Sequence, residues 1–143
     1  MYNVLLIAQY IIRYCSIKGY FVSNLKLQKF LYFVQAEFLV SKGSPCFPET
    51  IHAWNFGPVV PIVYRRYKIY GSSQIPVTRS SIEGNIAYND KLVINAIIDV
   101  CSKFTASQLV DITHNQTPWM EAYSFGRDCV ITKNSIKKFF EKP

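Results

Sequence analysis

The side chains of this chain best suited to chemistry are four cysteines and two histidines: Cys15, Cys46, Cys101, Cys129, His52 and His114. Structural zinc sites usually start from two cysteines two to four residues apart, and no such pair occurs. Neither histidine has a second histidine four residues further on. No local signature of a thiol enzyme surrounds any cysteine. We therefore predict no metal site and no cysteine nucleophile.

Other common catalytic patterns are also absent from the sequence. The six glycines are scattered, and neither GxGxxG nor GxxxxGK[ST] occurs, which removes the usual nucleotide-binding loops. The nine acidic residues show no clustering of the kind that paired catalytic carboxylates require. We predict that the chain is not an enzyme, that it has no catalytic residues and that it uses no cofactor.

Length and composition indicate one folded domain. The chain has 143 residues, of which half are hydrophobic, and this size gives a core that needs no disulfide or metal. We expect residues 1–143 to form a single domain. Cys15 and Cys101 fall in apolar helical patterns, where a free cysteine acts as a small hydrophobic side chain. The opening segment lacks the features of a signal peptide and is too short to span a bilayer. These observations favour a reduced, cytoplasmic protein with no membrane partner.

Positive charge is concentrated in the first half of the chain. Residues 1–70 hold eight lysines and arginines against two glutamates, within a total net charge of +7. Such a distribution favours an acidic partner, which can be nucleic acid, an acidic protein or an anionic surface. Basic and aromatic residues interleave at 64–70, and the partner-binding candidates there are Arg65, Arg66, Tyr67 and Lys68. The same segment also fits a plain amphipathic helix with its tyrosines inward.

The patterning predicts a mainly α fold, α+β at most, with five to six helices around a central hydrophobic helix and a few short strands. The central helix covers 24–42, with Ser23 as its N-cap. Further helices are expected at 3–16, at 58–70 with Pro58 in the first turn, at 90–104 capped by Asp90, at 105–114, from 117 and from 132. Short strands are expected at 51–54 and near Ile131. Residues 71–89 read as a long loop with a small hairpin at 75–77 or 82–87.

A few polar and aromatic positions allow two interpretations. Lys29 and Gln35 interrupt the central helix, either on a narrow exposed side or bonded to buried backbone groups. Trp54 suits the core better than an interface. His114 stands at a helix end, where it can bond loop carbonyls. In the helix at 90–104 the expected inward residues are Leu92, Val93, Ile97, Val100, Cys101 and Phe104.

Three segments together resemble the Panacea domain, the family of SocA-like antitoxins and prophage-associated proteins. The first is LKLQKFLY at 25–32, with Phe30 in a leucine place. The second is IHAWNFGPVVPIVY at 51–64, with His52 where the family usually has glutamate, so any role of that acid is lost here. The third is THNQTPW at 113–119. The motif positions are Lys29, Tyr32, Gln35, Trp54, Gly57, Pro58, Tyr64, His114, Pro118 and Trp119.

The resemblance implies a compact, mainly helical binding module that is not an enzyme. Its implied partner is a cognate toxin encoded nearby, neutralised by direct contact or by acting as an adaptor that delivers the toxin to a host protease. The resemblance also implies residence in a prophage or another mobile element. The alternative is a nucleic-acid-binding regulatory protein, which the basic half and the 64–70 segment would support. Whether the motif positions bind a partner or hold the fold stays open at this point.

Overall fold

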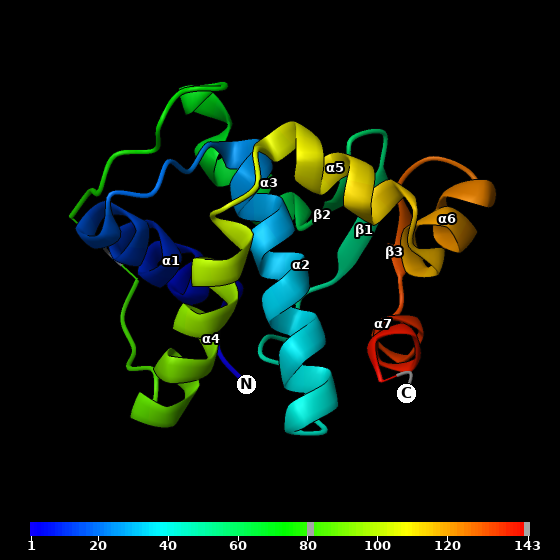
Figure 1. Cartoon of the computed structure of the whole chain (residues 1–143), viewed down its shortest axis with the longest axis horizontal. Helices are drawn as coiled ribbons and strands as arrows, with labels where there is room; N and C mark the ends of the chain where they lie inside the picture. Colours follow the sequence, from blue (N-terminus) through cyan, green and yellow to red (C-terminus); the bar gives the residue numbers. More distant parts are fainter. Residues whose placement is uncertain (80–81, 142–143) are drawn as a thin grey trace.

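A long central helix, α2 (Asn24–Ser41), organises the fold in the computed structural model, which describes residues 1–79 and 82–141. In Figure 1, α1 (Val4–Lys18) and α4 (Tyr88–Cys101) lie on one side of α2, and α7 (Lys133–Phe140) lies on the other. Helix α5 (Ala106–His114) crosses near the start of α2. Most positions of α2 are buried, as expected for the central helix of a domain.

Side-chain caps set where the helices begin. Ser23 accepts from the amide of Lys26, and Asn3 and Thr132 cap α1 and α7 in the same way. Thr105 and Gln108 form a complete capping box before α5. Helix α1 stops at Gly19, whose φ of 75° suits the left-handed end of a helix. Of these residues, Ser23 was predicted as an N-cap from the sequence, and the structure confirms it.

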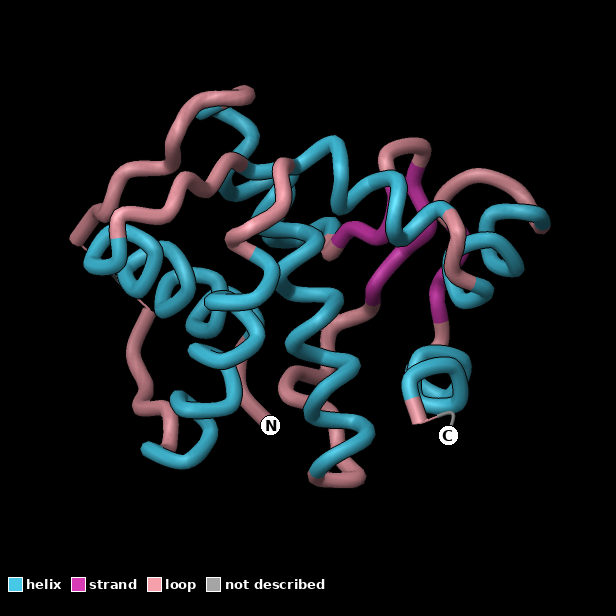
Figure 2. Tube along the Cα trace, viewed as in Figure 1, coloured by secondary structure: helices cyan, strands magenta, loops and turns pink. Residues whose placement is uncertain are grey.

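Three short strands form an antiparallel sheet in the order β2-β1-β3, beside the helices in Figure 2. Strand β1 (Ile51–Trp54) pairs with β2 (Gly57–Val59) through a tight turn, and with β3 (Cys129–Ile131) on its other edge. Along β1, Ile51 and Ala53 are buried. The alternation of a strand therefore turns His52 and Trp54 to the opposite face, where both are half-buried.

The third helix begins later than predicted. Pro58 lies in edge strand β2 rather than in a helical first turn, and Pro61 is the early helical proline of α3 (Pro61–Tyr67). An edge strand tolerates proline because one of its sides needs no ladder hydrogen bond. A 3₁₀ turn, η1 (Lys68–Tyr70), follows α3.

The inward face of α4 was predicted only in part: Cys101 is buried and Val93 and Ile97 pack against the core, as expected. The fully buried side chains are Ile94 and Ile98, with Cys101 close to fully buried, whereas Leu92, Val100 and Phe104 are exposed. The predicted cap Asp90 instead lies inside the first turn, after Ala87. There its carboxylate pairs with Lys42 and accepts a hydrogen bond from Tyr2. Tyr2, just before α1, and Tyr10 and Tyr14 on α1 thus donate hydrogen bonds to Asp90, Asn95 and Asp99 of α4, and these contacts orient the helix.

The remaining elements follow the expected order. Helix α6 (Thr117–Ser124) starts at Thr117, as expected, with Gln116 in the N-cap position. No strand forms within the described part of 71–89, and Ser80 and Ser81 lie outside the described residues. The described residues hold seven α-helices, which correspond to the seven segments predicted as helical although the total expected was five to six, and the mainly α class is confirmed.

Residues 1–79 and 82–141 contain no single helix with the length and apolar composition needed to cross a membrane. Only the bent pair α4 and α5, which meet at 99°, meets those criteria together.

Candidate protein-binding groove

The β1–β2 hairpin rests on a buried lysine. Lys29 is completely buried, and its Nζ donates to the Pro58 carbonyl oxygen over 3.1 Å. Burial lowers the pKa of the Lys29 ammonium to about 7. Gly57 lies directly above it with φ of 102°, and a Cβ there would come within 2.7 Å of Lys29 Cε. The exposed-surface interpretation of Lys29 was therefore wrong, and both motif residues hold the hairpin.

An aromatic stack also supports the turn of the hairpin. The His114 ring lies 4.1 Å from that of Trp119, which lies 4.5 Å from that of Tyr123. All three residues bond the turn: His114 Nε2 contacts the Asn55 carbonyl at 2.9 Å, Trp119 Nε1 donates to the Trp54 carbonyl, and Tyr123 donates to the Asn55 side chain. His114 thus has the structural role that its position had suggested.

The other polar motif residues of α2 fix loops. Gln35 is fully buried, which contradicts its exposed interpretation. It donates to the Phe47 carbonyl and accepts from the amides of Cys46 and Phe47. Tyr32 donates to Gln116 over 2.7 Å, just before the buried Pro118 of α6. Neither side chain reaches the surface, so both are structural positions.

Trp54 stands outside the core cluster, which corrects its predicted core position. Its ring meets Tyr64 edge-on at 5.1 Å, and its Nε1 donates to Asp128 Oδ1 over 2.8 Å. His52 Nδ1 reaches the same oxygen at 2.8 Å. Asp128 adopts a left-handed conformation with φ of 61°. The hydrogen bonds from Trp54 and then His52 hold the pKa of the Asp128 carboxyl below its usual value. The Asp128 carboxylate therefore stays ionised at neutral pH.

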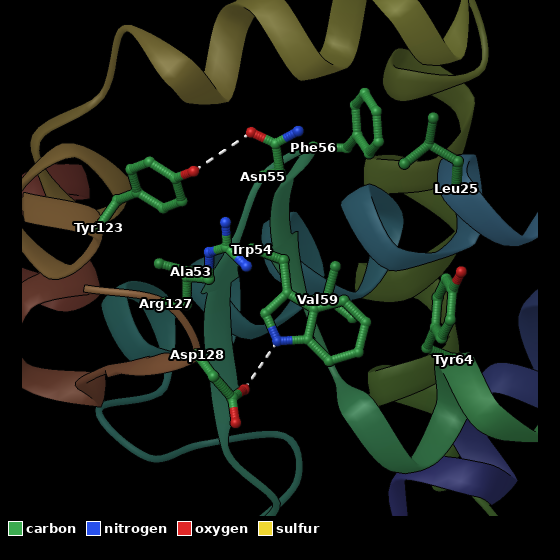
Figure 3. Close-up of a pocket in the computed structure, with 10 residues that line it drawn as sticks. All are labelled: Leu25, Ala53, Trp54, Asn55, Phe56, Val59, Tyr64, Tyr123, Arg127 and Asp128. Atoms are coloured by element: carbon green, nitrogen blue, oxygen red, sulfur yellow. Dashed lines mark hydrogen bonds between the residues drawn. The ribbon is translucent and has the colours of Figure 1, made fainter.

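Two adjoining hollows meet at Trp54 and Asp128, and together they form what we call the hairpin groove. The larger, of about 590 Å³, is drawn in Figure 3. The smaller, of about 460 Å³, lies on the other side of Trp54. The larger hollow is lined by Leu25, Ala53, Trp54, Asn55, Phe56, Val59, Tyr64, Tyr123, Arg127 and Asp128. Its size is that of a ligand or side-chain pocket, and aromatic walls with arginine are typical of protein interfaces.

The predicted basic segment meets this groove at one residue. Arg65 lines the smaller hollow, together with His52 and Asp128. Arg66 and Lys68 are exposed but line neither hollow, and Tyr67 is half-buried and stacks with Tyr70. The tyrosine therefore belongs to the packing of the helix, while the three cations remain available to a partner.

Sequence reasoning missed four groove residues: Phe56, Tyr123, Arg127 and Asp128. Phe56 lies within the second motif segment, and nothing in the sequence indicates that its side chain is 61% exposed. The segment around Arg127 and Asp128 has no periodicity, so only the pairing of β1 with β3 reveals that it faces Trp54. The described residues contain no group of three or more side chains placed to hold a metal ion.

Comparison with known proteins identifies the class to which this fold and groove belong. The family model described as "Antitoxin SocA-like, Panacea domain" matches residues 27–120, which include most of α2, the hairpin and the start of α6. The chain therefore belongs to the Panacea-domain family of SocA-like antitoxins.

One curated relative is similar over much of the chain. This is Antitoxin SocA of Caulobacter vibrioides (strain NA1000 / CB15N), 33% identical over 111 residues. The match covers 68% of this chain and 58% of the relative, so the similarity spans little more than half of that protein. No solved structure matches the chain.

Proposed function

We propose that this chain is an antitoxin that neutralises a cognate toxin by direct contact, and that the toxin docks on the hairpin groove. The observation that carries the proposal is the placement of the family motifs. Lys29, Gly57, His114 and Trp119 all act on one hairpin. That hairpin displays Trp54 and Phe56 in a hollow at the surface. A binding loop keeps the geometry that its partner recognises when specific packing holds it from beneath.

A protein partner fits the groove better than nucleic acid does. The two hollows contain the carboxylates of Asp128 and Glu49 beside the cations of Arg127 and Arg65. A binder of nucleic acid would present a surface of one sign, because phosphate contacts dominate its affinity. Mixed charge around aromatic walls suits a folded or extended protein surface. We infer a non-catalytic role in the cytoplasm, where the four free cysteines would stay reduced.

Growth in a bacterial host tests the function directly. The product of the reading frame beside this gene is expressed with and without the chain. Toxicity that disappears on co-expression supports the proposal, and toxicity that persists contradicts it. Toxin abundance, followed by immunoblot after synthesis is stopped, separates two mechanisms. Blocking by contact leaves the toxin's half-life unchanged or longer, whereas delivery to a protease shortens it and requires that protease.

A further inference from the structure

The larger hollow contains a cation that nothing in the described structure neutralises. Arg127 lines this hollow, and Figure 3 shows its side chain directed toward Trp54. Across residues 1–79 and 82–141, its guanidinium makes no hydrogen bond and no ion pair. The neighbouring Asp128 carboxylate is engaged elsewhere, because one of its oxygens accepts from both Trp54 and His52. The arginine is thus held beside an acid with which it does not pair.

The walls of the same hollow are apolar and incompletely covered. Phe56 is 61% exposed at the tip of the hairpin, and Leu25 and Tyr64 also line the hollow. Burying such a side chain against a partner removes apolar surface from water, which lowers the free energy by about 25 cal/mol per Å² of buried surface. An occupant with an apolar side chain would therefore gain by entering between Phe56, Trp54 and Tyr64.

We propose that the larger hollow binds an acidic segment of the toxin, in which an apolar side chain enters between Trp54, Phe56 and Tyr64 and a neighbouring carboxylate pairs with Arg127. This inference rests on the proposed function and specifies the chemistry of the partner. The guanidinium of Arg127 can hold a carboxylate with two parallel hydrogen bonds. The exposed cations of α3 lie next along the surface, since Arg65 lines the adjoining hollow. Their charge extends the same preference for an acidic partner beyond the hollow itself.

A titration without the toxin tests the chemistry of the hollow. The ¹⁵N-labelled chain is titrated with acetyl-Glu-Phe-Glu-amide and with acetyl-Gln-Phe-Gln-amide, each to millimolar concentration. The acidic peptide should shift the Trp54 indole and the amides of the hairpin, and bind several-fold more tightly than the neutral one. Arg127→Gln should abolish that difference, while Arg13→Gln, an exposed arginine on α1, should preserve it. Equal binding of the two peptides, no binding, or shifts outside the hairpin would overturn the proposal.

The same spectra exclude or reveal a nucleic-acid site. An oligothymidylate titrated in place of the peptide should leave the hairpin resonances unchanged at physiological salt. Tighter binding of this single-stranded DNA than of the acidic peptide at the hairpin would overturn the proposal in favour of a nucleic-acid ligand. The titration is independent of neutralisation. If the chain binds the peptide but does not rescue growth, the proposal for the hollow stands and the proposed antitoxin function fails. If it rescues growth but does not bind the peptide, only the proposal for the hollow fails.

A charge-exchange experiment then identifies the toxin residue whose carboxylate pairs with Arg127. Arg127→Glu should lose neutralisation at an unchanged melting temperature, because Arg127 is exposed and makes no hydrogen bond or ion pair with the other described residues, whereas Arg127→Lys should retain it in part. The toxin is mutagenised, and variants are selected that are still toxic alone but are neutralised by Arg127→Glu. These variants should carry an acidic residue changed to lysine or arginine. Full neutralisation by Arg127→Glu, or suppressors that never change an acid, would contradict the pairing.

Discussion

At the scale of single residues, the motif positions that support the hairpin are distinct from the residues that the hairpin displays to solvent. Lys29, Gly57, His114 and Trp119 contact or bond the hairpin from within, and none of them lines either hollow. The residues that a partner can reach are those that the hairpin displays, above all Phe56. A substitution in the first group should change stability, and a substitution in the second should change binding.

Gly57 is the sharpest test of close packing under the hairpin. In Gly57→Ala the new Cβ would meet Lys29 Cε at 2.7 Å and Thr113 Oγ1 at 2.9 Å, and both side chains are fully buried. Gly43→Ala is the matched control, since Gly43 also has positive φ but has open space around it. Denaturant unfolding should show Gly57→Ala to be roughly 1–3 kcal/mol less stable than the control. Equal losses in the two variants would show that the space above Lys29 can relax.

The buried Lys29 should make the free energy of unfolding depend on pH. Its pKa is about 7 in the folded chain and near 10.5 when exposed, so the unfolded chain binds more protons between these values. Stability should therefore rise with pH in that window, by up to about 1.4 kcal/mol per unit from this group. Below pH 7 both states carry the charge, and the contribution becomes constant. Lys29→Met should flatten the slope between pH 7 and 10, measured by urea unfolding. A variant with the wild-type slope would contradict the assignment.

At the scale of elements, the sequence predicted where helices begin more reliably than which face they bury. Caps at Ser23, Thr105 and Thr132 are local, because each side chain bonds an amide three residues away. The rotation of α4 depends instead on partners distant in sequence. Tyr10 bonds Asn95, and Tyr14 bonds Asp99, across the α1–α4 seam. With apolar residues on both sides of α4, periodicity alone could not choose between them.

The hairpin region shows the same limit. Strand β1 was predictable from its β-prone residues, but the strand role of Pro58 was not, because a Gly-Pro pair precedes helices as readily as it enters edge strands. The family resemblance located the motif residues without separating supports from contacts. Arg127 and Asp128 reach the groove only through the pairing of β3 with β1, which is a contact between distant segments that no local pattern encodes.

A second prediction about the partner concerns the cations of α3 and of the η1 turn that follows it. Reversing Arg65, Arg66 and Lys68 to glutamate should slow association with the toxin and weaken its salt dependence, because exposed charges act mainly on encounter. Reversing Arg13, Lys18 and Lys103 changes the net charge equally at other exposed positions and should have a smaller effect. Stopped-flow association rates at two ionic strengths compare the two triple variants, with melting temperatures as the folding check. Equal rates would remove α3 from the interface.

At the scale of the whole molecule, the net charge of +7 and the sparse charge of the chain have one explanation in the proposed function. A partly apolar groove flanked by cations is a surface suited to an acidic protein partner. The helices α1, α4 and α7 enclose α2, and α2 in turn carries the side chains that fix the hairpin and its neighbouring loops. On this account, most of the chain serves to hold one small surface rigid.

The central claim is that the toxin binds at the hairpin groove, and the affinity of the purified toxin for two phenylalanine variants tests it most directly. Phe56 lines the groove and is 61% exposed, while Phe21 is 51% exposed and lines neither hollow. Calorimetry should show that Phe56→Ser weakens binding by about tenfold or more, that Phe21→Ser binds as the wild type does, and that both melt as the wild type does. Wild-type affinity of the Phe56→Ser variant would contradict the account.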